Sequence, residues 1–154
     1  KPSNILLGPD CAKLSDFGIA KALDRPAITE IGIGLGTLAY CAPEQALSAM
    51  DVDPRADIYG LGATLYHLVT GRPPYDTTRP VMQILTEITG DGSPAPIREH
   101  RPDVPKPLVD LIESMLQKDP AKRPQTAAAV VTELKRIGEF VLRPDTDLSQ
   151  THSD

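Results

Sequence analysis

Two carboxylates that flank an irregular stretch are the residues of this chain best suited to chemistry. Asp16 follows a short apolar run and opens the tripeptide Asp-Phe-Gly, and Glu44 closes the tripeptide Ala-Pro-Glu. Residues 19–40 lie between them and show no hydrophobic periodicity. A carboxylate at the end of a strand can hold a metal ion, and through it a phosphate, while an irregular segment can act as a lid. These residues therefore predict a phosphate-and-metal site with a regulated lid.

Two short strands should position the first carboxylate. Residues 5–7 are apolar, residues 11–14 are strand-like, and the sequence Gly-Pro-Asp between them favours a tight turn. Asn4 precedes the first strand and Asp16 follows the second. Antiparallel pairing would bring these two side chains to the same end of the hairpin.

Five helices should follow the hairpin, because apolar residues recur at three- and four-residue steps. A short helix should begin at Pro43, and the next should be capped by Asp53, with Pro54 at its first position, and stop at Gly71. This second helix is apolar on most sides and should be central and buried. The apolar positions are Ile58, Leu61, Leu65 and Leu68 in the second helix; Val81, Ile84, Leu85 and Ile88 in the third, which stops at Gly90; Leu108, Leu111, Ile112, Met115 and Leu116 in the fourth; and Ala127, Val130, Val131, Leu134 and Ile137 in the fifth. Residues 91–107 should form a proline-rich loop, and residues 138–154 a tail.

The composition is that of an ordinary globular domain. The 154 residues are 40% hydrophobic and 24% charged, which is enough for a core. A net charge of -5 argues against nucleic acid as a partner. Cys11 and Cys41 are too few for a disulfide framework, and no apolar run reaches membrane-spanning length, so a cytoplasmic location is expected. Because the chain begins with Lys1 and not Met, we do not expect a whole translation product.

Five motifs occur in an order that is typical of one family. They are Lys1-Pro-Ser-Asn4, Asp16-Phe-Gly18, Gly36-Thr-x-x-Tyr-x-Ala-Pro-Glu44, Asp57-x-Tyr-Gly-Leu-Gly62 and Asp119-Pro-x-x-Arg123-Pro. In this order they resemble a protein kinase catalytic domain over residues 1–137. The sequence Thr-Gly-Arg-Pro-Pro-Tyr at residues 70–75 looks most like the bacterial serine/threonine kinases of eukaryotic type.

The resemblance implies a mainly α-helical fold with a short β-hairpin, which is the large C-terminal lobe of the α+β kinase fold with the N-terminal lobe absent. Residues 1–15 would be the end of the catalytic loop and the hairpin, and residues 16–44 the activation segment. Residues 45–137 would form the helical subdomain, and residues 138–154 the C-terminal tail.

Asn4 and Asp16 match the two magnesium ligands of the family. Magnesium is a hard cation that prefers oxygen ligands and bridges the oxygens of ATP, so an amide and a carboxylate suit it. The resemblance therefore implies Mg²⁺ and ATP as cofactors of the complete domain. The alternative is that both residues occupy ordinary turn positions.

Lys1 and Thr37 are the residues that the resemblance places at the reaction. Lys1 matches the lysine two residues after the catalytic aspartate, where a cation would balance charge on the transferring phosphoryl group. Thr37 matches the threonine that packs against that aspartate and lysine and shapes the substrate site. Both favour serine/threonine specificity. In this chain alone, however, Lys1 is expected to be a frayed surface charge.

Within the activation segment the resemblance gives Phe17 and Gly18 a structural role. Thr37 already has a role in the substrate site, and Thr29 is the only other hydroxyl residue in the sequence between Gly18 and Tyr40. Thr29 is therefore the natural candidate for regulatory phosphorylation. A phosphate on Thr29 could order the segment by pairing with an arginine. The equally weighted alternative is that Thr29 is a plain polar loop residue. The glycines of this segment follow no strand and open no long helix, so we interpret them as lid flexibility.

Three further residues match structural positions of the family. Glu44 and Arg123 match a buried ion pair that ties the end of the activation segment to the helical body, and Glu44 would also favour a helix N-terminus. Asp57 matches the acid at a helix start that holds the backbone of the catalytic loop. Its alternative role is that of a first-turn acid favoured by the helix dipole.

The resemblance implies part of a serine/threonine protein kinase that transfers the γ-phosphate of ATP to protein substrates. Its expected partners are the protein substrate, ATP and the missing N-terminal lobe, with kinase dimerisation as a further option. The glycine-rich loop, the lysine–glutamate pair and the His-Arg-Asp catalytic loop are not in this sequence. We therefore expect the isolated chain to transfer no phosphate. The alternative is a truncated or kinase-like module that binds partners without catalysis, through residues 81–88 and an exposed upper surface.

Overall fold

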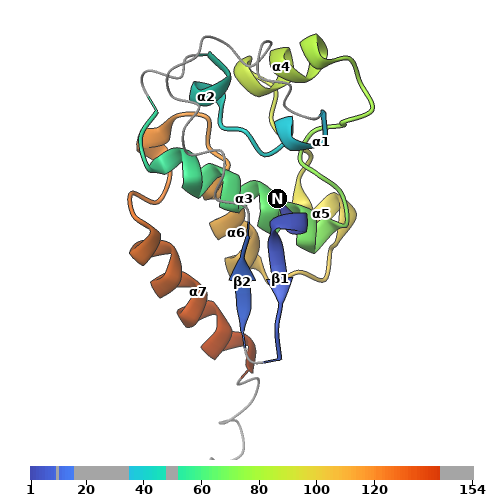
Figure 1. Cartoon of the computed structure of the whole chain (residues 1–154). Helices are drawn as coiled ribbons and strands as arrows, with labels where there is room; N and C mark the ends of the chain where they lie inside the picture. Colours follow the sequence, from blue (N-terminus) through green and yellow to red (C-terminus); the bar gives the residue numbers. More distant parts are fainter. Residues whose placement is uncertain (10, 16–34, 48–51, 143–154) are drawn as a thin grey trace, which may run out of the picture.

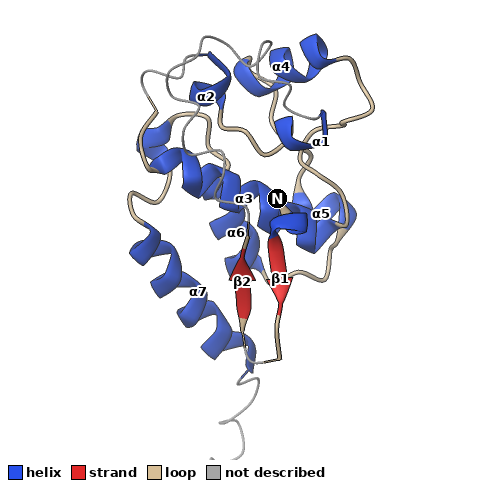
Figure 2. Cartoon of the chain, in the orientation of Figure 1, coloured by secondary structure: helices blue, strands red, loops and turns tan. Residues whose placement is uncertain are grey.

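The computed structural model describes residues 1–9, 11–15, 35–47 and 52–142. It consists of a small β-hairpin and a larger set of helices, as the sequence predicted (Figure 2). The turn that precedes the hairpin contacts α3 (Arg55–Thr70), and α7 (Ala127–Leu142) lies to one side of the hairpin in Figure 1. The short helices α1 (Leu35–Leu38) and α2 (Pro43–Leu47) lie with α4 (Val81–Thr89) at the opposite end from the tip of the hairpin.

The hairpin follows a short 3₁₀ turn, η1 (Pro2–Asn4). Strands β1 (Ile5–Leu7) and β2 (Ala12–Leu14) pair antiparallel, with Ile5 opposite Leu14 and Leu7 opposite Ala12. The predicted strand at residues 11–14 therefore begins one residue later, because the carbonyl of Cys11 closes the turn by accepting from the Gly8 amide at 3.0 Å.

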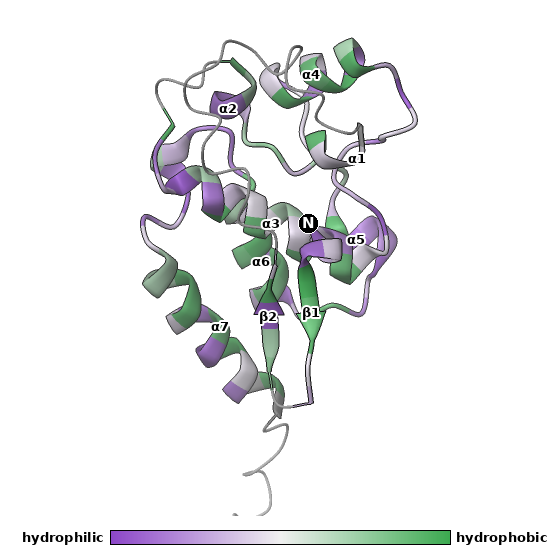
Figure 3. Cartoon of the chain, viewed as in Figure 1, coloured by the Kyte–Doolittle hydropathy of each residue, from purple (hydrophilic) through white to green (hydrophobic). Residues whose placement is uncertain are grey.

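The hairpin exposes apolar side chains. Strand β1 is hydrophobic along its length (Figure 3), yet Leu6 and Leu7 are 57% and 86% exposed, and Leu14 on β2 is 62% exposed. The described residues thus leave an apolar surface on this side of the molecule.

Helix α3 (Arg55–Thr70) is the centre of the helical part. It starts one residue later than predicted, and an Asp53 carboxylate oxygen accepts from the Arg55 amide at 2.8 Å. Hydrogen bonds from the Arg55 side chain and backbone lower the pKa of Asp53 to about 2, so this carboxylate stays charged. The helix ends as predicted at Gly71, whose φ of 76° places it in the left-handed region.

The buried face of α3 matches the predicted one only in part: Ile58 is buried and Leu65 packs against the core. Leu61 and Leu68 are 40% and 57% exposed, whereas Tyr59, Ala63 and Tyr66 are buried in the largest cluster. The reason is the close approach of α6, which packs where α3 presents its smallest residues. The main sites of contact are therefore set by small and aromatic residues and not by the leucine repeat.

Gly62 marks the closest approach of these two helices. A Cβ added there would lie 2.7 Å from the Cβ of Met115, on α6 (Lys106–Met115).

Helix α6 confirms the expected fourth helix, and it starts two residues before Leu108, the first apolar residue of the predicted pattern. Within the predicted loop 91–107 the structure also contains a short helix, α5 (Ile97–His100), which the sequence analysis missed.

Helix α7 (Ala127–Leu142) packs against α6 through Val130 and Ile137, which are buried. Val131, expected on the same side, is 49% exposed because it lies about 100° around the helix from its neighbour. The helix also continues past residue 137, where the tail was predicted to begin. Gly138 stays helical, and among the described glycines only Gly71 has a positive φ.

A second group of helices lies at the end of the molecule opposite the tip of the hairpin (Figure 1). It contains α2 (Pro43–Leu47), which begins as predicted, α4 (Val81–Thr89), which stops before Gly90 as predicted, and α1 (Leu35–Leu38), which lies in a segment expected to be a loop. Helices α2 and α4 pack against each other, and Ile84 and Ile88 are fully buried between them and the chain that follows α1.

Candidate functional site

The side chain of Lys1 reaches the segment that carries Thr37. Its Nζ donates to Thr37 Oγ1 at 3.1 Å across 36 residues of sequence. The η1 turn fixes the backbone beneath it, because the carbonyl of Lys1 accepts from the Asn4 amide at 2.9 Å. The expectation of a frayed surface charge is therefore wrong. A lysine that approaches the end of a small helix finds a hydroxyl acceptor there, and this pairing orders its side chain.

Asn4 lies at the open end of the hairpin. Its backbone carbonyl accepts from the amide and the hydroxyl of Ser15, at 2.8 and 3.2 Å, so the residue before Asp16 sits directly beside Asn4. Within the described residues, the Asn4 carboxamide makes no hydrogen bond. Asp16 itself, with Phe17, Gly18 and the candidate phosphosite Thr29, lies outside the described residues.

The chain that follows Thr37 is held by a tight turn. The amide of Tyr40 donates to the carbonyl of Thr37 at 3.1 Å, and the amide of Cys41 to that of Leu38 at 3.0 Å. Leu38 and Ala39 are buried against α4. The hydroxyl of Thr37 is thus presented by a turn whose underside is anchored in the core.

Tyr40 adds a second attachment, to α3. Its hydroxyl hydrogen-bonds to His67 Nδ1 at 2.5 Å, and the two rings are nearly parallel, with an interplanar angle of 13°. Burial raises the pKa of Tyr40, so its hydroxyl stays protonated at neutral pH and can donate to the imidazole. Sequence analysis gave His67 no role, because a pairing between residues 27 positions apart has no local signal.

Cys41 belongs to the same turn. Its thiol approaches the side-chain oxygen of Gln45 at 3.7 Å, and that oxygen also accepts from the Ala42 amide at 3.0 Å. Burial, helped by the negative charge of Glu44, raises the pKa of the Cys41 thiol to about 11. The thiol is therefore protonated at neutral pH and serves packing.

Glu44 is joined to Arg123 by a bidentate ion pair, and Arg123 uses all five of its N–H donors. Nη1 donates to Glu44 Oε1 at 2.6 Å and Nη2 to Glu44 Oε2 at 2.8 Å. The same two nitrogens donate to the carbonyls of Arg55 at 3.0 Å and Lys118 at 2.9 Å. Nε donates to the carbonyl of Gln117 at 2.7 Å. The guanidinium thus connects α2 with the start of α3 and with the turn after α6.

This ion pair is removed from water. The Arg123 side chain is 0% exposed and that of Glu44 is 17% exposed. The guanidinium also lies 5.0 Å from the centre of the Tyr59 ring, and the Tyr59 hydroxyl shares a hydrogen bond with that of Tyr75 at 3.2 Å. Burial raises the pKa of Tyr59 far above its usual range, so a neutral ring faces the cation. A buried charge that is paired and fully hydrogen-bonded is tolerated in a protein interior.

Asp57 lies in the first turn of α3 and is exposed. Its position there suits the helix dipole. Its role in holding a catalytic loop stays a prediction.

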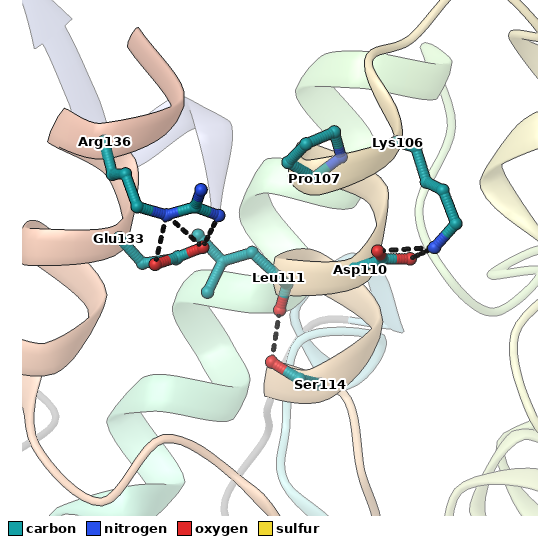
Figure 4. A pocket seen from close by; sticks show the side chains of 7 residues that line it. All are labelled: Lys106, Pro107, Asp110, Leu111, Ser114, Glu133 and Arg136. Atoms are coloured by element: carbon teal, nitrogen blue, oxygen red, sulfur yellow. Dashed lines mark hydrogen bonds and ion pairs between the residues drawn. The ribbon is translucent and has the colours of Figure 1, made fainter. Parts of the chain in front are cut away.

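A hollow of about 390 Å³ lies between α6 and α7 and holds none of the predicted site residues (Figure 4). Its charged side chains pair with one another. Lys106 Nζ donates to the Asp110 carboxylate at 2.6 and 2.8 Å, and Arg136 donates to Glu133. Because these charges are already matched, we place the candidate site at Lys1, Asn4 and Thr37 instead.

Comparison with known proteins decides the family. The family model described as protein kinase domain matches residues 1–134. The chain belongs to the protein kinase family. It is 40% identical over 124 residues to the serine/threonine-protein kinase PknA of Mycobacterium tuberculosis, covering 80% of the chain and 27% of that protein. It is 39% identical over 142 residues to PknB of Mycolicibacterium smegmatis, covering 90% of the chain and 22% of that kinase.

A probable serine/threonine-protein kinase of Clostridium acetobutylicum is 35% identical over 151 residues, which is 97% of this kinase-family chain and 22% of the clostridial protein. The chain therefore spans about a quarter, or less, of the length of these bacterial relatives. The resemblance drawn from the five motifs is confirmed, as is the mainly helical fold with a hairpin. None of the helices that the structure describes combines the length and apolar character needed to cross a membrane.

Proposed function

We propose that this chain is the C-terminal lobe of a serine/threonine protein kinase that transfers the γ-phosphate of ATP to serine or threonine residues of protein substrates in the cytoplasm. The observation that supports this proposal most is the hydrogen bond from Lys1 to Thr37, at 3.1 Å. It joins the first motif to the third, which are the parts that a kinase must bring together where phosphate is transferred.

Lys1 and Thr37 have complementary roles in this proposal. The Lys1 ammonium supplies positive charge where negative charge develops on the transferring phosphoryl group. The Thr37 hydroxyl holds that ammonium in place and forms part of the surface that receives the substrate hydroxyl. The turn at Thr37 and its attachment through Tyr40 to α3 keep this surface rigid, which favours a reactive geometry.

Asn4 and Asp16 would hold Mg²⁺ with bound ATP. An amide oxygen and a carboxylate are the hard donors that this cation prefers, and Asn4 lies at the end of the hairpin next to Ser15, the residue before Asp16. When bound, Mg²⁺ neutralises charge on the phosphate oxygens. Through that ion Asn4 and Asp16 would orient the phosphates, while Glu44 with Arg123 would fix the far end of the segment that begins at Asp16.

A chimeric kinase provides the test. This chain would replace the matching segment of PknB from Mycolicibacterium smegmatis, and transfer of radiolabelled phosphate from Mg-ATP to a threonine peptide would be measured. We expect transfer by the chimera and by its Thr37→Ser variant, and a loss of about a hundredfold in kcat/KM for Thr37→Val, which removes the hydroxyl but keeps the shape.

Folding and ATP binding of the chimera serve as controls. A chimera that unfolds cooperatively and binds Mg-ATP, yet transfers no phosphate, would contradict the proposal. That result would favour a kinase-like module that binds partners without catalysis.

A further inference from the structure

Lys118 has no part in the proposed chemistry, yet it holds the end of α4. Its Nζ donates to the carbonyl of Glu87 at 2.6 Å and also to the carbonyl of Gly90. Both carbonyls lie at the C-terminal end of α4, where backbone oxygens lack partners within the helix and the helix dipole favours a cation. Lys118 therefore caps α4 from a segment 28 to 31 residues away.

The backbone that carries Lys118 is itself held by the buried arginine. Arg123 donates to the carbonyls of Gln117 and Lys118, at 2.7 and 2.9 Å, while it binds Glu44 on α2. One two-residue turn, Gln117-Lys118, thus fixes two helices. It reaches α2 through the guanidinium and α4 through the lysine side chain.

Helix α4 in turn supports the turn at Thr37. Ile84 and Ile88 are each 0% exposed, and they pack in one cluster with Leu38 and Ala39, the two residues that follow Thr37. The interior of a protein is closely packed, so a shift of α4 must be followed by the residues that rest on it. A displacement at the capped end of α4 would therefore reach Thr37.

We propose that Lys118 is a positioning residue for the segment that carries Thr37. By capping α4 it keeps Ile84 and Ile88 against Leu38 and Ala39, and this contact sets the place of the Thr37 hydroxyl beside Lys1. The proposed coupling from Lys118 through α4 to Thr37 involves described residues only. Its effect on a substrate rests on the proposed function.

Amide hydrogen exchange of the whole 154-residue chain tests the coupling. In Lys118→Met we expect exchange at the amides of Gly90, Tyr40 and Cys41 to be faster by about tenfold, because each reports a hydrogen bond at one end of the coupled unit. Exchange in the central part of α6 should not change. Lys118→Arg, which keeps the charge and the donors, should restore most of the protection.

Lys106→Met is the matched control, because Lys106 is also paired, with Asp110, but lies exposed on α6. It should leave all three probe amides unchanged. If Lys118→Met does not fold, Lys118→Gln carries the same comparison with a smaller change. Faster exchange at Gly90 with unchanged Tyr40 and Cys41 would overturn the proposal, as would a uniform acceleration throughout α3 and α6.

Kinetics of the chimeric kinase supply the functional readout. Lys118→Met should raise the KM for the peptide substrate by about tenfold while the KM for ATP stays the same, and Lys118→Arg should reverse most of this change. A purely structural role would lower the amount of folded enzyme and would not change one KM alone. The exchange experiment needs no phosphate transfer, so failure of the proposed function would leave its outcome readable.

Discussion

Replacing Arg123 by methionine should be among the most destabilising single changes in this chain. The substitution keeps an apolar stem but removes five donated hydrogen bonds, two of them to Glu44. It leaves a carboxylate whose side chain is 17% exposed, together with three backbone carbonyls, without their donor. Removing one partner of a buried ion pair typically costs about 3–5 kcal/mol, so we expect the free energy of unfolding to fall by about 4 kcal/mol.

The companion variant Glu44→Gln should cost less, about 2 kcal/mol, because an amide oxygen can still accept one hydrogen bond from the guanidinium. In the double variant the two costs should not add. We expect a coupling energy of about 2 kcal/mol, which is within the range measured for residues in one hydrogen-bond network.

Urea unfolding followed by far-ultraviolet circular dichroism would measure these energies. Arg136→Met is the matched control, since its ion pair with Glu133 has side chains that are 62% and 37% exposed, and such pairs contribute about 0–1 kcal/mol. A cost below about 1 kcal/mol for Arg123→Met, or full additivity with Glu44→Gln, would refute the view that this pair fixes α2 to the helical body.

Three further outcomes are expected. Gly62→Ala should lower the free energy of unfolding by about 1–3 kcal/mol in urea titrations, because its Cβ would lie 2.7 Å from a side-chain atom of α6. A Cβ at Gly138 would meet no described atom within 4 Å, so Gly138→Ala should instead raise the free energy of unfolding by about 0.5–1 kcal/mol, and equal effects would contradict the close approach. Cys41, with its pKa raised from 9.0 to about 11, should hold about a hundredfold less thiolate at pH 8 than an ordinary thiol, so mass spectrometry should find alkylation at exposed Cys11 first. Rapid alkylation of Cys41 at pH 8 would contradict its burial. Because the folded-state pKa of Cys41 is raised, its contribution to the free energy of unfolding should be present below pH 9 and decline as the pH rises towards 11. Tyr40→Phe should lower the free energy of unfolding by about 1 kcal/mol and speed amide exchange in the turn that follows Thr37, and an unchanged exchange rate would show that its bond to α3 does not hold this turn.

Much of the site could be predicted because its signals are local or belong to motifs. The hairpin follows from two apolar runs and a turn, and α3 ends at Gly71 because a glycine there adopts the left-handed conformation. The pairing of Glu44 with Arg123, 79 residues apart, could be expected only from the resemblance of the motifs to a family. Nothing in the local sequence connects these two residues.

The errors have a common physical cause. Periodicity marks which residues could share a helix face, but the neighbouring helix decides which face is buried. Leu61 and Leu68 stay exposed because α6 approaches α3 at Gly62. The short helix α5 lies in a proline-rich stretch that the sequence analysis interpreted as a loop. It is one turn long, and Ile97 anchors it in the core, a contact that has no local sequence signal.

By itself, the sequence determined the family, the hairpin and the order of the five longer or motif-bearing helices, and it predicted Lys1, Asn4, Thr37, Glu44 and Arg123 as site residues. The tertiary structure decided how they are held. It ordered Lys1 by giving it the Thr37 hydroxyl, and it brought Lys118 to the end of α4. Such contacts depend on the docking of whole helices across tens of residues, and side-chain chemistry selects them only after packing has brought the partners within reach.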